Sequence, residues 1–154
     1  MSEWKRTTRK LDVIDIQIDR QRTFYKHINT NNLGNPLGKT LMSVETVSER
    51  KGGSGMGDSV VTCNAVITPV WIMWVTRGDK SDLAAFSAKL ENVQITDYAE
   101  SPKAALNPDS GLVITGMFTG KECEQSNAFI GLGEEPEAKA FKDTVFQAIH
   151  NLKK

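Results

Sequence analysis

The sequence predicts an α+β fold in one domain of 154 residues. From residue 41 onward, short segments alternate apolar and polar residues and are separated by turns rich in Gly, Pro, Asn and Asp, a pattern typical of closely spaced β-strands. The chain then ends in an amphipathic segment with helical spacing. Seven strands followed by one helix predict a partly open β-barrel or sandwich whose open end the helix covers.

The seven strands are expected where apolar residues recur at every second position or in a short apolar run between turns. Dense turn chemistry bounds each of them, including four glycines in residues 51–59 and two prolines in residues 100–110. The expected strands are 41–50, 60–68, 70–76, 82–90, 93–98, 111–118 and 127–132.

The final helix is expected at about residues 135–152. Its start is marked by Glu134, Glu135 and Glu137 around Pro136, because acidic side chains suit the positive end of a helix and Pro suits its first turn. Apolar residues follow at helical spacing, which predicts one buried face. They are Ala138, Phe141, Val145, Ala148, Ile149 and Leu152.

Residues 1–40 form a predicted N-terminal extension to a domain at 41–154. The basic stretch WKRTTRK (4–10) has no apolar period and predicts a flexible arm. Residues 11–19 alternate and predict an extended edge segment, and residues 20–29 predict a short helix because Phe24 and Ile28 are four residues apart. Residues 30–40 have the composition of turns.

Two parts of the sequence resemble a known family. The run VITPVWIMWVTRGDKSDLAAFSAKLENVQITDY (66–98) is similar to the core of bacterial pleckstrin-homology (PH)-like domains, and GLVITGMF (111–118) with NAFIGLGEEPEAKAFKDTVFQAI (127–149) resembles the end of such a domain. The resemblance covers roughly residues 41–152 and rests on pattern. It implies a PH-like barrel and a small binding or scaffolding module, and some bacterial members of the family form rings.

The resemblance departs from the family at its best-known ligand site. Eukaryotic members bind phosphoinositides through basic residues at the end of the first strand and along the second. Arg50 and Lys51 match the first part of that pattern, but residues 60–68 contain no basic residue for the second. Pro69 and Val70 also stand where a basic residue is common in the family.

The strand VWIMWVT (70–76) poses a question about packing. Alternation places Trp71, Met73 and Val75 on one face and Ile72 with Trp74 on the other, so the strand presents a tryptophan on each face. One face enters the core. The second tryptophan is covered by residues 11–37, by the final helix, by a second subunit or by a ligand, since exposed apolar patches mark interfaces. Trp71 and Trp74 are therefore candidate partner-binding residues.

The Gly-rich loop GGSGMG (52–57) lacks the Lys-Ser/Thr of a P-loop and is followed by a strand, not by the helix of a dinucleotide site. It is most simply a hairpin loop. With Arg50, Lys51 and Met56 it is also a candidate contact for a partner or an anionic headgroup.

Composition narrows the function classes further. The formal net charge is 0, which argues against nucleic-acid binding. No apolar run is long enough for a membrane helix, and the two cysteines, Cys63 and Cys123, are expected to be free thiols in a cytoplasmic protein. The histidines, His27 and His150, have no companions at metal-ligand spacing, so no metal or cofactor is expected.

The leading hypothesis is therefore a non-catalytic, cytoplasmic module that acts through protein contacts or self-assembly. An alternative is a peripheral module that binds anionic lipid or phosphate headgroups through Arg50, Lys51 and the 52–57 loop. An enzyme is the third hypothesis, and it would require a spatial cluster around Cys123 or His27 that the sequence does not reveal.

Overall fold

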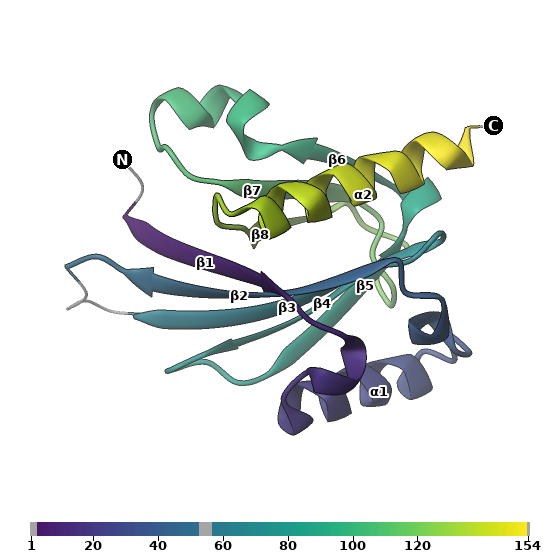
Figure 1. Ribbon diagram of the computed structural model, residues 1–154. Helices are drawn as coiled ribbons and strands as arrows, with labels where there is room; N and C mark the ends of the chain where they lie inside the picture. Colours follow the sequence, from purple (N-terminus) through teal and green to yellow (C-terminus); the bar gives the residue numbers. More distant parts are fainter. Residues whose placement is uncertain (1–2, 53–56, 154) are drawn as a thin grey trace.

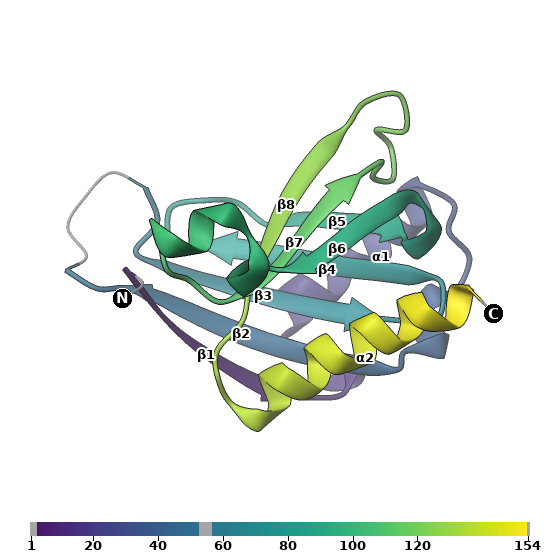
Figure 2. The same cartoon turned by 90° about the horizontal axis from the view of Figure 1, so that it is seen from above.

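In the computed structural model, which describes residues 3–52 and 57–153, the chain forms two antiparallel β-sheets. The larger sheet has the strand order β1-β2-β3-β4-β5 and the smaller one has the order β6-β7-β8. One helix, α1, covers one face of the larger sheet, and the smaller sheet lies with the second helix, α2, over the other face (Figure 1). The β7–β8 hairpin crosses the larger sheet and extends past β5 (Figure 2).

The strands are β1 (Trp4–Lys10), β2 (Met42–Arg50), β3 (Val60–Ile67), β4 (Trp71–Gly78), β5 (Ala84–Lys89), β6 (Val93–Asp97), β7 (Gly111–Gly116) and β8 (Ser126–Gly131). The α-helices are α1 (Ile18–Thr30) and α2 (Pro136–Leu152). Short 3-10 turns occupy the connections, two of them in the segment between β6 and β7. No helix among the described residues is long and apolar enough to cross a membrane.

The α+β class, the seven strands expected after residue 40 and the final helix are confirmed. The two sheets remain separate and form no closed barrel. Pro136 stands in the first turn of α2, and the apolar stripe of this helix is buried against the larger sheet, as its spacing predicts.

Two expectations for the N-terminal extension were wrong. Residues 4–10 are not a flexible arm but strand β1, which pairs with β2 along its whole length. Residues 11–19 are not an extended edge; they form a 3-10 turn at Val13–Asp15 and the beginning of α1. The helix expected at residues 20–29 is present. Strand β1 escaped detection because it packs polar side chains against β2, so its sequence carries no apolar period.

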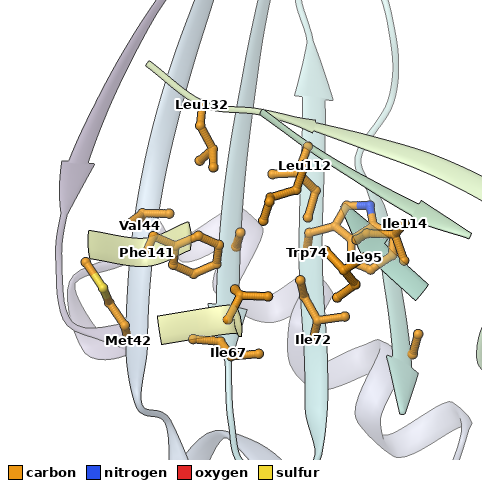
Figure 3. Close-up of a cluster of buried hydrophobic side chains, with 14 of the residues drawn as sticks. Met42, Val44, Ile67, Ile72, Trp74, Ile95, Leu112, Ile114, Leu132 and Phe141 are labelled. Carbon is orange, nitrogen blue, oxygen red and sulfur yellow. The ribbon is translucent and has the colours of Figure 1, made fainter. Parts of the chain in front are cut away.

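The inner face of the larger sheet, which is covered by the smaller sheet and α2, carries the main core (Figure 3). Trp74 lies at its centre, with the Phe86 ring stacked at 5.6 Å and the Phe118 ring edge-on at 5.5 Å between centroids. Phe141 of α2 is fully buried in the same cluster. The other labelled members are Met42, Val44, Ile67, Ile72, Ile95, Leu112, Ile114 and Leu132.

The outer face, which is covered by α1, carries a second and smaller core. Phe24 and Ile28 of α1 are buried against Met73 and Val75 of β4. Trp71 is half-buried at the edge of this cluster. The expectation that β4 carries one tryptophan on each face is therefore confirmed, and residues 11–37 supply the cover for the outer face.

Candidate functional site

The two tryptophans of β4 have different access to a partner. Only 2% of the Trp74 surface is exposed, and its ring is enclosed by Phe86, Phe118 and α2-facing residues of the inner core. No partner can contact it while the fold is intact. Trp71 is half-buried at the beginning of the strand, where its ring borders open space. Of the two, only Trp71 can contact a ligand directly.

The turn before Trp71 holds this residue in place. The Thr68 hydroxyl accepts hydrogen bonds from the main-chain N–H groups of Val70 and Trp71, at 3.1 and 2.8 Å, and the Thr68 N–H donates to the Trp71 carbonyl at 2.9 Å. A side chain that bonds to nearby N–H groups in this way fixes a tight turn. On the next strand, Lys89 is the register partner of Trp71, and its ammonium group lies 5.7 Å from the indole centroid.

Two grooves meet at the Trp71 ring. The first has a volume of about 440 Å³ and lies between the residues that follow α1 and the β3–β4 turn; it is lined by Leu33, Asn35, Pro36, Gly38, Lys39, Thr68, Pro69, Val70 and Trp71. The second has a volume of about 620 Å³ and lies between the end of α1 and the β7–β8 hairpin; it is lined by Asn31, Asn32, Leu33, Trp71, Lys89, Asn92, Met117, Phe118, Thr119, Gly120 and Glu122. We call Trp71 and these two grooves the Trp71 face.

The Trp71 face combines apolar contact area with polar groups that can orient a ligand. Val70 is 46% exposed in the first groove and Met117 is 42% exposed in the second. Asparagine amides and the ammonium groups of Lys39 and Lys89 surround them. A concave, mainly apolar surface with a few polar groups is the usual form of a binding site.

The other sequence candidates lie at the opposite end of the sheet. Arg50 ends β2, and the register of β2, β3 and β4 places that end beside Gly78, seven residues along β4 from Trp71. The Arg50 guanidinium carbon lies 5.0 Å from the centroid of the Trp4 ring, and Lys51 is exposed. Met56 falls outside the described residues. The structure thus separates Arg50 and Lys51 from Trp71 and does not combine them into one site.

Trp4 and Arg6 of β1 are the residues at this end that the sequence did not single out. The Arg6 guanidinium donates two hydrogen bonds of 2.8 Å to the Asp109 carboxylate and one of 2.6 Å to Ser48. It also lies 5.4 Å from the Trp4 ring and 5.2 Å from the Phe129 ring. No signal in the sequence pairs Arg6 with Asp109, because 103 residues separate them.

A groove of about 630 Å³ lies beside these residues and has mixed charge. Lys5, Arg6 and Lys51 contribute positive groups, while Asp109, Glu134 and Glu135 contribute negative ones; the remaining lining residues are Trp4, Pro108, Ser110 and Gly133. The Arg6 charge is already compensated by Asp109. This groove therefore lacks the concentrated positive charge that attracts an anionic headgroup.

His27 has acquired two hydroxyl neighbours that the sequence could not reveal. Its Nε2 lies 2.8 Å from Ser87 Oγ, and Ser87 Oγ donates to Thr119 Oγ1 at 2.7 Å. The Asn31 amide nitrogen, which can only donate, lies 3.4 Å from His27 Nδ1, so Nε2 carries the proton and donates to Ser87. In this arrangement His27 cannot accept the Ser87 proton, and Ser87 is fully buried. The chain of hydrogen bonds ties α1 to β5 and to the β7–β8 hairpin.

The cysteines are both free, and they differ in environment. Burial raises the pKa of the Cys63 thiol to about 12, although the charges of Arg6 and Arg20 act in the opposite direction. A thiol with so high a pKa is a poor nucleophile at neutral pH. Cys123 is exposed in the β7–β8 hairpin. Within the described residues, no three His, Cys, Asp or Glu side chains are grouped closely enough to hold a metal ion.

Comparison of the chain with protein-family models, with curated proteins and with solved structures gave no match.

Proposed function

We propose that this chain is a non-catalytic cytoplasmic binding module that receives a segment of a partner protein at the Trp71 face. The observation that carries this proposal is the half-buried Trp71 ring between two grooves, with exposed Val70 and Met117 beside it. Tryptophan is enriched at the energetic centres of protein interfaces because its large rigid ring buries much apolar area at a small cost in side-chain entropy.

The rigid setting of Trp71 supports the same proposal. The ring is held by the Thr68 turn on one side and by Lys89 on the other, so little side-chain freedom is left to be lost on binding. The edges of both grooves carry asparagine side chains, which can donate to and accept from the main chain of a bound peptide. We therefore expect an extended or turn-forming peptide with at least one apolar anchor residue.

We also propose that residues 41–154 form a PH-like domain. The order of elements supports it: four strands in one sheet, three in a second sheet and a C-terminal helix follow one another after residue 40. Domains built in this way commonly act as binding or scaffolding modules, although function has to be argued from the site.

The Trp71 face can be tested by selecting peptides from a random library on the native protein and measuring their affinity for two variants. We expect Trp71→Ala to weaken the selected peptides by about 30-fold, the effect of losing an interface residue worth about 2 kcal/mol. Trp4→Ala is the matched control, since Trp4 is a second half-buried tryptophan at the opposite end of the sheet. In NMR spectra, the indole N–H signal of Trp71 should shift on binding and that of Trp74 should not.

Two results would overturn the proposal. One is the failure of repeated selections to give any peptide that binds the folded protein. The other is a set of peptides whose affinity is the same for the Trp71→Ala variant and for the native chain, which would place the binding surface elsewhere.

The two alternatives have weaker support. For a headgroup-binding module, Arg50 and Lys51 are at hand, but the groove beside them also contains three carboxylates. For an enzyme, the cluster at His27 has its serine buried and its hydrogen bonds directed away from a base-and-nucleophile arrangement. Neither site offers the charge or the geometry that its function would need.

A further inference from the structure

The four edge strands of the two sheets are protected to different degrees. An unprotected edge presents unpaired N–H and C=O groups that another strand can bind. At the β1 edge, the Thr8 N–H donates to Glu135 Oε2 at 3.1 Å, and the Gly133 N–H donates to the Thr8 hydroxyl at 2.8 Å. The residues that lead into α2 therefore cover this edge.

The edges at β5 and β6 also have protection. At β5, the Thr119 N–H of the β7–β8 hairpin donates to the Ser87 carbonyl at 2.9 Å, and Lys89 places a charge at the end of the strand. Strand β6 ends in Asp97, whose carboxylate pairs with Lys142 of α2 at 3.0 Å. Charged residues at an edge and covering segments are the common protective devices.

The β8 edge has no such device among the described residues. The Leu132 N–H donates to the Ser110 carbonyl, which makes Ser110 and Leu132 a hydrogen-bonded pair in the β7–β8 register. Because such pairs alternate in an antiparallel ladder, the main-chain groups of Asn127 and Phe129 point away from β7. No described residue hydrogen-bonds to them, and both residues are exposed, Phe129 by 39%.

The composition of β8 adds to this exposure. The strand SNAFIG contains no charged residue and no proline, which are the residues that usually prevent pairing between edges. At its C-terminal end the free edge stops, because the Arg6 guanidinium lies directly against Gly131. The open part is therefore the segment from Ser126 to Phe129, and Figure 2 shows β8 at the outside of its sheet.

We infer that two copies of this chain pair through antiparallel β8 strands, with Ala128 of each copy at the two-fold axis. In this register Asn127 of one copy faces Phe129 of the other, and each such pair forms two main-chain hydrogen bonds. The small Ala128 side chains allow the strands to approach closely at the axis. The Phe129 rings would pack against the Asn127 side chains of the other copy, and the two three-stranded sheets would become continuous.

A second copy is the favoured occupant because the surface is self-complementary. Isologous pairing places β8 opposite itself, and a strand without charge meets no like-charge repulsion there. The whole chain has a formal net charge of 0, so no long-range repulsion separates two copies near neutral pH. This inference concerns a surface other than the Trp71 face and does not depend on peptide binding there.

The test is sedimentation velocity of the full chain over a wide range of concentrations, combined with hydrogen exchange followed by NMR. We expect a reversible monomer–dimer equilibrium in which the Asn127 and Phe129 amides exchange more slowly as concentration rises. The Ala128 and Ile130 amides, which already bond to β7, should not respond to concentration.

Asn127→Pro removes one outward donor per copy and leaves the β7–β8 ladder intact, since the Asn127 N–H takes no part in it. It should weaken the dimer on the order of tenfold or more, because two hydrogen bonds are lost per dimer. Asn127→Lys should also weaken it by adding a charge to the edge. Gln94→Lys is the matched control: it adds the same charge to an exposed position of β6 and should leave the dimer unchanged.

The inference is overturned by a chain that stays monomeric up to its solubility limit, or by a dimer that both Asn127 variants leave unchanged. A dimer whose concentration-dependent protection appears at other amides would equally place the interface elsewhere.

Discussion

The two faces of the five-stranded sheet are covered in different ways. On the inner face, the smaller sheet and α2 enclose a cluster of apolar side chains around Trp74 and Phe141. On the outer face, α1 covers a smaller apolar cluster and also buries Arg20, which lies 3.0 Å from the Glu45 carboxylate and 2.5 Å from the Asn64 amide oxygen. The inner face is an ordinary core, whereas the outer face also contains polar interactions that require exact partners.

The charges on the outer face are mutually compensated. Burial raises the pKa of Glu45, but hydrogen bonds and charge from Arg9 and Arg20 outweigh it and bring the pKa below its ordinary value. Such a buried pair adds little net stability compared with an apolar pair, yet it allows only one position of α1. The difference between the faces teaches that the inner face supplies most of the stability, and the outer face determines where α1 and the Trp71 grooves lie.

The largest expected effect comes from shortening the central side chain of the inner core. Trp74→Ala should lower the free energy of unfolding by roughly 3–5 kcal/mol, because it creates a cavity and removes two aromatic contacts. Phe24→Ala on the outer face should cost less globally and should raise hydrogen exchange mainly in α1. Denaturant titration with residue-resolved exchange measures both. Equal global losses with uniform exchange would show that the two faces form one cooperative core.

The next effect concerns the buried pair on the outer face. Glu45→Ala should cost about 3 kcal/mol or more, because it leaves the Arg20 guanidinium buried without its carboxylate. The double variant Arg20→Met with Glu45→Met should cost less than Glu45→Ala alone, since no unpaired charge remains under α1. Chemical denaturation of the three proteins gives the comparison. A double variant that is less stable than the single one would contradict this account.

A smaller effect should follow pH. Burial lowers the pKa of His27 below 6.5, so near pH 6 the unfolded chain binds a proton that the folded chain does not. The contribution of neutral His27 to stability is therefore complete above pH 6.5 and is lost as pH falls through that value toward the folded-state pKa. Thermal unfolding between pH 5 and pH 8, roughly the titration range of histidine, should show this slope, and His27→Gln should reduce it. An equal slope in the variant would refute the assignment.

The smallest expected effect concerns lipids. Co-sedimentation with neutral and anionic vesicles should show little binding that salt abolishes, because the Arg6 charge is paired with Asp109 and carboxylates share the groove with Lys51. Strong binding to anionic vesicles that is lost at high salt, and lost again in the Arg50→Ala with Lys51→Ala variant, would instead favour the headgroup-binding alternative over the Trp71 face.

Much of the fold could be predicted because it depends on local patterns. Alternation in residues 41–50 and 60–68, and the helical spacing after Pro136, survive in the structure since each apolar face is buried where it formed. Strand β1 could not be predicted in this way. Its inward side chains, Trp4, Arg6 and Thr8, pair with polar residues of β2, and polar pairing leaves no hydrophobic period to detect.

The candidate site was predictable only as a residue type. The sequence identified Trp71 as a tryptophan that needed a cover, but it could not show that Trp71 lies at an edge and Trp74 at the centre of a core. It also grouped Arg50 and Lys51 with these tryptophans as candidates. The strand register places them at opposite ends of the sheet.

By itself, the sequence determined the α+β class, the strands after residue 40, the two helices and the presence of a tryptophan on each face of β4. These follow from periodicity, which is a property of neighbouring residues. Tertiary structure alone decided the pairing of Arg6 with Asp109, the protection of three sheet edges and the exposure of β8. Such features depend on residues that are distant in the chain and meet only when the sheets stack, so no local pattern encodes them.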